Sequence, residues 1–194
     1  MKNSEYERIV KEMEYNLSAR HSFLTFAFTT TLAILGVAFT SDIKNEWLFL
    51  APFFLIVPFT ARIAYLRQTH AHYSSFLRVF YSEEMIWGQL TRTYCPIRRN
   101  RADIIIEVLV NFEMFFLSLC CTAVFFYKYP TPIADFLFID WVKCSIPILL
   151  SGIVVALTMA GYNYGKMMKK YEEKWIKAKN CRQEEYGTEE KNGD

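Results

Sequence analysis

Residues 22–40 read SFLTFAFTTTLAILGVAFT, a run of nineteen residues without one charged side chain. A helix of that length rises about 28 Å, which matches the roughly 30 Å hydrocarbon core of a bilayer. Three more apolar runs follow, at 47–66, 104–127 and 141–162. Backbone groups in lipid must bond within their own segment, so each run is predicted to be a transmembrane helix.

The composition supports this fold class. The 194 residues are 53% hydrophobic and 22% charged, and the mean hydropathy is only +0.10 because the charged residues gather between the apolar runs. A disordered chain would lack this apolar content. We therefore predict an all-α polytopic membrane protein with a four-helix transmembrane domain, residues 22–162, and helical cytoplasmic extensions.

The basic residues predict the orientation of the chain. Of the 22 Lys and Arg, 19 lie before the first run, around the middle segment 67–103, or after the fourth run. The two other connections hold only Lys44, Lys128 and Lys143. The positive-inside rule then places both termini and the middle segment in the cytoplasm.

Two terminal extensions carry apolar stripes at helical spacing. In residues 1–21 the stripe is Tyr6, Val10, Met13 and Leu17, and we expect it to pack on another cytoplasmic element, because four glutamates weaken attraction to anionic lipid. Residues 163–194 are predicted to form a basic helix that ends near Gln183. The acidic tail from Glu184 onward is predicted to be disordered.

Arginines supply the candidate ligand site. Residues 62–103 hold seven Arg and no Lys, with aromatic residues interleaved. Guanidinium groups grip phosphate with two hydrogen bonds and aromatic rings stack on bases, so the mixture suits a nucleotide or short oligonucleotide. The alternative is that membrane topology explains the arginines and helix packing explains the rings. The predicted ligand-binding residues are Arg78, Tyr81, Trp87, Arg92, Tyr94, Arg98, Arg99 and Arg101.

Small and hydroxyl residues share one face of two predicted spans. In the first span and in the fourth they recur every three or four residues. Such a face predicts close helix packing or, in the first span, a polar pore wall built by several subunits. The two sets are Ser22, Thr25, Thr29, Ala33, Gly36 and Thr40, and Gly152, Ala156 and Ala160.

Polar side chains inside the third predicted span are also functional candidates. Charge within a membrane helix is costly and usually faces protein or water. The alternatives for these side chains are a cation pathway or gating contact, or a structural bond. The pore or gating candidates from both spans are Thr25, Thr29, Glu107, Asn111 and Glu113.

The enzymatic alternative rests on one short pattern. Arg67 and His72 have the Arg-x4-His spacing of HEPN-type ribonucleases, so a membrane-anchored ribonuclease is one rival and a non-conducting scaffold subunit is another. His70 and His72 point about 200° apart on a helix, which disfavours a shared metal. Because no P-loop, nucleophile elbow or zinc signature occurs, we predict no catalytic residue, metal or cofactor.

The order of apolar runs resembles a known group of bacterial proteins. The resemblance covers roughly residues 5–90 and rests on AILGVAFT at 33–40, LFLAPFFLIVP at 48–58, YSSFLRVF at 73–80 and Trp87. These segments look like the membrane effectors of Hailong antiphage systems. The resemblance carries no individual site residue.

Several functional expectations follow from the resemblance. It implies a homo-oligomeric channel, with a tetramer favoured, in the bacterial inner membrane. A nucleotide or oligonucleotide second messenger made by a partner enzyme would open the channel. Its opening would depolarise the infected cell in a form of abortive infection. Membrane lipid is the other expected partner.

Overall fold

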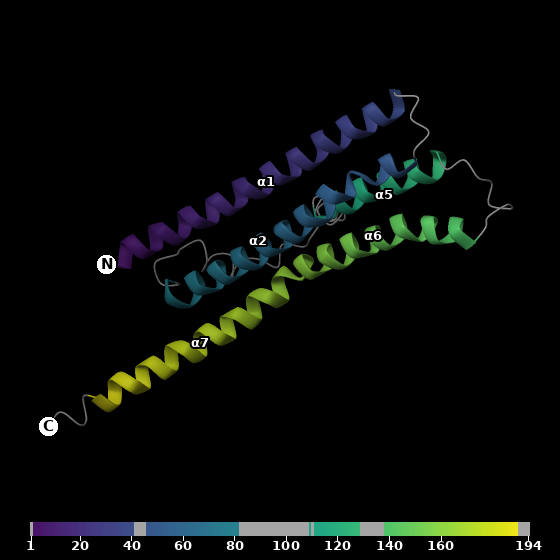
Figure 1. The fold of residues 1–194 in the computed structure, drawn as a ribbon. Coiled ribbons are helices and arrows are strands. Elements are labelled where there is room, and N and C mark those ends of the chain that lie inside the picture. Colours follow the sequence, from purple (N-terminus) through teal and green to yellow (C-terminus); the bar gives the residue numbers. More distant parts are fainter. Residues whose placement is uncertain (1, 41–45, 82–108, 110, 129–137, 190–194) are drawn as a thin grey trace, which may run out of the picture. The chain divides into compact units, whose positions relative to one another are not determined.

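The computed structural model describes residues 2–40, 46–81, 109, 111–128 and 138–189 (Figure 1). Every regular element within them is helical, as predicted. The elements are α1 (Lys2–Thr40), the 3-10 helix η1 (Glu46–Leu50), α2 (Phe53–Phe80), α5 (Glu113–Lys128), α6 (Phe138–Tyr162) and α7 (Tyr164–Glu189).

Three helical stretches are long and apolar enough to cross a membrane. They are Ser4–Thr40, Trp47–Phe80 and Phe138–Tyr162. α1 has 39 residues and α2 has 28, so they rise about 58 Å and 42 Å and exceed a 30 Å hydrocarbon core. Each therefore carries a polar part beyond its apolar part.

The predicted leader helix and the first predicted span are continuous in the structure. We assigned residues 1–21 to an amphipathic helix and residues 22–40 to the first span, and in the structure both belong to the one helix α1, Lys2–Thr40. The physical reason is that no Gly or Pro lies between Asn16 and Ser22 to end the helix.

The start of the second predicted span differs from expectation, whereas the predicted start of the third span lies outside the described residues. The α-helical part of the second span begins at Phe53, after η1, because a residue that precedes proline, here Ala51, is disfavoured in the α conformation. Pro58 lies inside α2, which continues to Phe80 as predicted. The continuous helix of the third span begins at Glu113, although residues 104–108 are outside the described part of the chain.

The C-terminal helix is longer than we predicted. α7 continues to Glu189, so the expectation of disorder from Glu184 onward is wrong as far as that residue. Glutamate and glutamine are good helix formers, and they dominate residues 183–189. α6 and α7 are separated only by Asn163.

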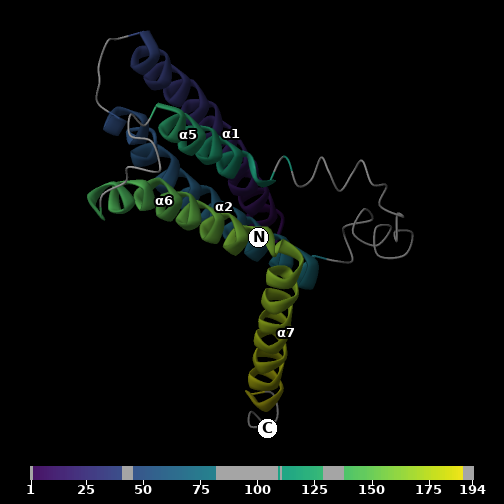
Figure 2. The same cartoon turned by 90° about the vertical axis from the view of Figure 1, so that its right-hand side faces the viewer.

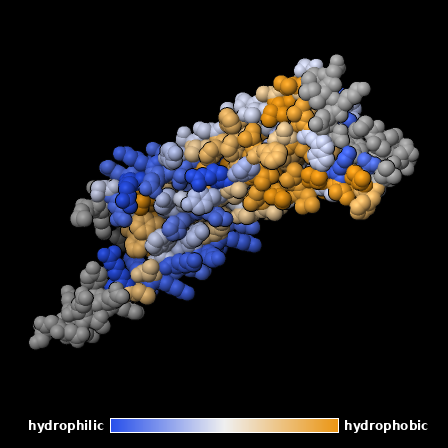
Figure 3. All heavy atoms as spheres, in the orientation of Figure 1, coloured by the Kyte–Doolittle hydropathy of each residue, from blue (hydrophilic) through white to orange (hydrophobic). Residues whose placement is uncertain are grey.

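The chain divides into two compact units. The apolar unit contains 17–66 and 101–162, and the polar unit contains 1–16, 67–100 and 163–194. Apolar residues gather over the helices of the apolar unit, and hydrophilic residues cover most of α7 (Figure 3). Both α1 and α2 contribute residues to each unit.

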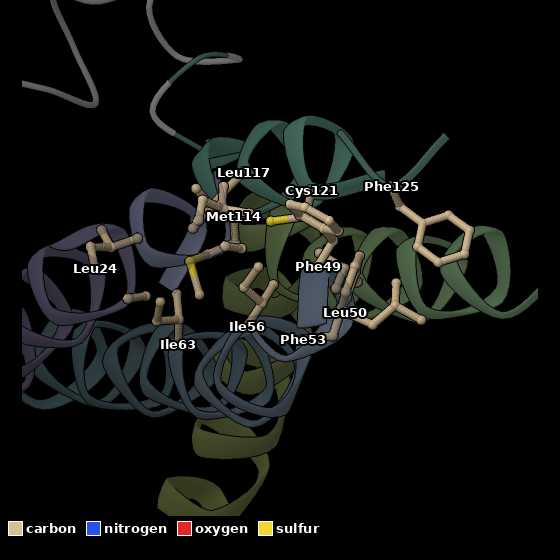
Figure 4. Packing of buried hydrophobic residues seen from close by; sticks show 14 of the residues in the cluster. Leu24, Phe49, Leu50, Phe53, Ile56, Ile63, Met114, Leu117, Cys121 and Phe125 are labelled. Carbon is tan, nitrogen blue, oxygen red and sulfur yellow. The ribbon is translucent and has the colours of Figure 1, made fainter. Parts of the chain in front are cut away.

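The apolar unit has one hydrophobic core. α5 contacts η1 and lies beside α6 in both ribbon views (Figures 1 and 2). Side chains from α1, η1, α2 and α5 meet between these helices (Figure 4). Ile56, Cys121 and Phe125 are fully buried there. A hydroxyl pair at 2.8 Å joins Thr122 of α5 to Ser151 of α6.

Candidate functional site

The small and hydroxyl face of α1 is exposed along its whole length. All six residues that we predicted to share it, Thr25 and Thr29 included, are exposed. The opposite face of the same helix holds Ala27, Thr31 and Ala38, all buried in the apolar unit. This face is therefore not an internal packing seam of the chain.

The hydroxyl groups on this face bond to their own helix. Thr29 Oγ1 donates to the carbonyl oxygen of Thr25 at 2.9 Å, and Thr40 Oγ1 donates to that of Gly36 at 2.9 Å. A Cβ atom added at Gly36 would meet nothing within 4 Å. The face is thus a shallow, hydroxyl-bearing surface that can accept a second helix or water.

α6 presents a similar exposed face. Gly152, Ala156 and Ala160 are all exposed, and a Cβ atom at Gly152 would also meet nothing within 4 Å. The buried side of α6 instead carries Ser151, Val154 and Thr158, among others. Both small-residue faces of the apolar unit therefore remain available for contact with another chain.

Glu113 is the first residue of α5. It stands in the first turn of α5, where a carboxylate interacts favourably with the free backbone N–H groups of the helix. Its charge also acts on Arg20 of α1, in the same unit. Asn111 precedes the same turn and is half-buried, whereas Glu107 lies outside the described residues. The structure thus supplies a charge partner for Glu113, on a helix far away in sequence.

The polar unit is held together by aromatic rings. Tyr81 is only 4% exposed and packs with Ile9 and Leu77, its ring 5.5 Å from that of Tyr6. The leader face therefore packs on α2, as we expected, although Leu17 is exposed. A ring this buried does not offer a face to a nucleobase in this conformation.

α7 packs on the polar part of α2 through a second ring cluster. The ring of Trp175 lies 5.0 Å from those of His72 and Phe76, measured between centroids. Tyr171 lies 5.0 Å from His72 on the same side. Lys179 Nζ donates to the backbone carbonyl of Val79 at 3.4 Å.

Arg78 is the ligand candidate that the structure places most openly. Its side chain is 43% exposed and pairs with Glu172 of α7 at 4.0 Å. A long exposed ion pair of this kind is weak, so a phosphate group could replace Glu172. The other six predicted ligand residues, Trp87, Arg92, Tyr94, Arg98, Arg99 and Arg101, lie outside the described residues.

The two residues of the ribonuclease pattern both lie on α2. Arg67 and His72 are five residues apart on α2, so their side chains leave the helix about 140° apart. Burial, followed by the nearby Lys174, lowers the pKa of His72, which lies in the polar part of α2. The His72 ring packs against the rings of Tyr171 and Trp175. Within the described part of the chain no group of three or more His, Cys, Asp or Glu could hold a metal ion.

The comparisons with known proteins provide no relative. The chain matches no family model, no curated protein and no solved structure at a significant level.

Proposed function

We propose that this chain is the subunit of a homo-oligomeric ion channel, opened from the cytoplasmic side by a nucleotide or short oligonucleotide. The observation that carries the proposal is the continuous exposed face of small and hydroxyl residues on α1. A face that offers hydroxyl groups gains little from hydrocarbon. It is better satisfied by another protomer or by a water-filled pore.

Four membrane spans are part of the proposal. α5 has 16 residues and rises about 24 Å, and Leu109 is also helical, so α5 would cross a slightly thinned bilayer as the fourth span. The distribution of Lys and Arg then puts both termini in the cytoplasm. One protomer of four helices encloses little space, so several copies, with a tetramer favoured, would share one axis.

The ligand would act on the polar unit. Arginines from the middle segment, with Arg78 at its start, would bind phosphate groups. Competition for Arg78 would weaken its pair with Glu172 and hence the contact of α2 with α7. The ligand opens the channel only if it binds the open form more tightly than the closed form.

The setting of the proposal is bacterial defence against phage. The apolar runs resemble Hailong membrane effectors, which implies an inner-membrane location and a partner enzyme that makes the signal. In this setting the ligand appears only after infection. Ion flow through the opened channel would then depolarise the cell.

Ion flux from liposomes tests the proposal. The purified protein would be reconstituted and exposed to a panel of cyclic and linear oligonucleotides. Ligand-dependent leakage is expected, together with its loss when Arg98, Arg99 and Arg101 are changed to Gln. Leakage that survives those substitutions would overturn the binding site, and no leakage from folded protein would favour the scaffold.

A further inference from the structure

The outer face of α7 carries a row of lysines. Lys166, Lys169, Lys170 and Lys177 are all exposed and fall within about 100° of one another around the helix, with Glu173 among them. Met168, Tyr171 and Trp175 lie on the opposite side, which packs on α2. Helix packing therefore leaves this lysine face uncovered.

The four lysines have no counter-charge from the rest of the described chain. None of them makes an ion pair with another residue that the structure describes, although Glu173 shares their face. By contrast, Lys174 and Lys179 approach the rings of Tyr171 and Phe80 on the packed side. With four lysines and Glu173, the face thus has a net positive charge.

The chain keeps the first lysine of this face close to the end of α6. α6 is one of the three membrane-crossing candidates and ends at Tyr162. Lys166 follows four residues later, which is at most about 14 Å of chain in any arrangement of the two units. Lys170 is one helical turn beyond, about 6 Å farther along α7.

We propose that the lysine face of α7, Lys166, Lys169, Lys170 and Lys177, binds the anionic phospholipid headgroups of the membrane that α6 crosses. Lysine clusters directly beside a membrane span attract acidic lipids through their summed charge. Ile176 lies next to Lys169 on the same side and is 46% exposed, which provides an apolar side chain for the headgroup boundary. The inference requires that α6 spans a bilayer and is independent of conduction.

The face suits a lipid surface better than a soluble nucleotide. Its lysines extend over twelve residues, a rise of about 16 Å, whereas one nucleotide concentrates its phosphates in a small volume. The rings that could stack on a base, Tyr171 and Trp175, point to the other side of the helix. Spread point charges match a surface of many headgroups.

The test uses the native thiol of Cys181. Cys181 is exposed and lies one helical turn beyond Lys177 on nearly the same face. With Cys95 and Cys120 changed to Ser, the full-length protein would carry a bimane label at Cys181. It would be placed in nanodiscs of phosphatidylcholine, with or without phosphatidylglycerol, that contain a spin-labelled quenching lipid.

We expect quenching by the lipid only when phosphatidylglycerol is present, and weaker quenching at high salt. Each lysine should contribute about fivefold to the ratio of docked to undocked α7. Changing the four lysines to Gln should therefore reduce quenching to the phosphatidylcholine level. The matched Lys→Arg variant should retain it.

Other outcomes would overturn the inference. Quenching that is equal in both lipids, or that survives the four Gln substitutions, would exclude lipid binding by this face. Inorganic phosphate or glycerol phosphate that displaces the label from the membrane at millimolar concentration would indicate a soluble phosphate site instead. Gln and Lys have similar helix propensities, so a change in helix content is not expected to obscure the result.

Discussion

Two threonines of α1 allow a matched test of the proposed pore face. Thr29 and Thr31 are two residues apart, so they point about 200° apart on the helix. Thr29 is exposed and bonds to Thr25, whereas Thr31 is fully buried. Thr31 Oγ1 has no hydrogen-bond partner among the described residues. Changing either threonine to valine removes a hydroxyl group with almost no change of shape.

The structure predicts opposite effects of the two substitutions. A buried hydroxyl without a partner costs about 1–3 kcal/mol, so Thr31→Val should raise the free energy of unfolding by about 1 kcal/mol. The hydroxyl of Thr29 only bonds to its own helix, so Thr29→Val should change that free energy by less than about 1 kcal/mol. If Thr29 faces a pore, however, the same substitution makes the wall apolar.

Thermal unfolding in detergent and ligand-dependent flux from liposomes would be measured on both variants. For a chain of this size 1 kcal/mol corresponds to about 2–4 °C in Tm. We expect Thr31→Val to raise Tm by that amount without changing flux. We expect Thr29→Val to leave Tm unchanged and to lower flux severalfold.

Three results would contradict the proposed roles of Thr29 and Thr31. Wild-type flux through Thr29→Val would mean that the exposed face of α1 does not line the pore. A lower Tm for Thr31→Val would mean that its hydroxyl group is bonded in the protein. Equal effects of both substitutions on flux would mean that the exposed and buried faces of α1 do not differ in their role in conduction.

Three further predictions concern contacts within each unit. In a double-mutant cycle, Arg20→Gln and Glu113→Gln should show a favourable coupling energy in Tm measurements, whereas additive effects would exclude an interaction between the two charges. Trp175→Ala removes the ring contacts with His72 and Phe76 and should lower the free energy of unfolding by about 3 kcal/mol. The control Ile176→Ala, on the exposed side, should lower it by less than about 1 kcal/mol. Amide exchange in α7 would measure both effects. Because the pKa of His72 is lowered, the unfolded chain takes up its proton more readily, so the stability from the neutral ring is fully present above about pH 6.5 and is lost as the pH falls below it. Amide exchange in α7 should rise between pH 7 and 5 in the wild type, and His72→Gln should abolish that rise.

Periodicity predicted which residues share a face but not what that face meets. The spacing of Thr25, Thr29 and Gly36 placed them on one side of a helix, and the structure agrees. Whether that side is buried depends on how α2 and α5 pack on α1, which local spacing does not contain. The apolar leader stripe was more informative, because the four glutamates beside it disfavoured a membrane surface and favoured packing on another element. The sequence did not indicate that this element is α2.

The contacts that sequence reasoning missed join residues far apart in the chain. Arg20 and Glu113 are on α1 and α5, and no pattern within either helix indicates the other. The same holds for His72 and Trp175. The sequence suggested a catalytic role for the histidine, whereas in the structure its ring packs against that of Trp175. A helix boundary such as the unbroken α1 was predictable in principle, since the decisive signal was the absence of Gly and Pro.

The exposed faces of α1, α6 and α7 are where the proposed oligomer and the proposed lipid contact would form. The three faces suit different surroundings. The hydroxyl-bearing face of α1 suits a polar partner or water, and the glycine and alanines of α6 suit a closely packed helix. The lysines of α7 suit anions. In a lipid-embedded monomer the hydroxyl groups of α1 would bond only to their own helix, and the small residues of α6 would have no helix packed on them. An assembly in which α1 faces a common axis and α6 meets a neighbouring protomer would satisfy both at once. Cross-linking between Cys residues placed at Gly36 and at Gly152 would distinguish the axial contact from the lateral one.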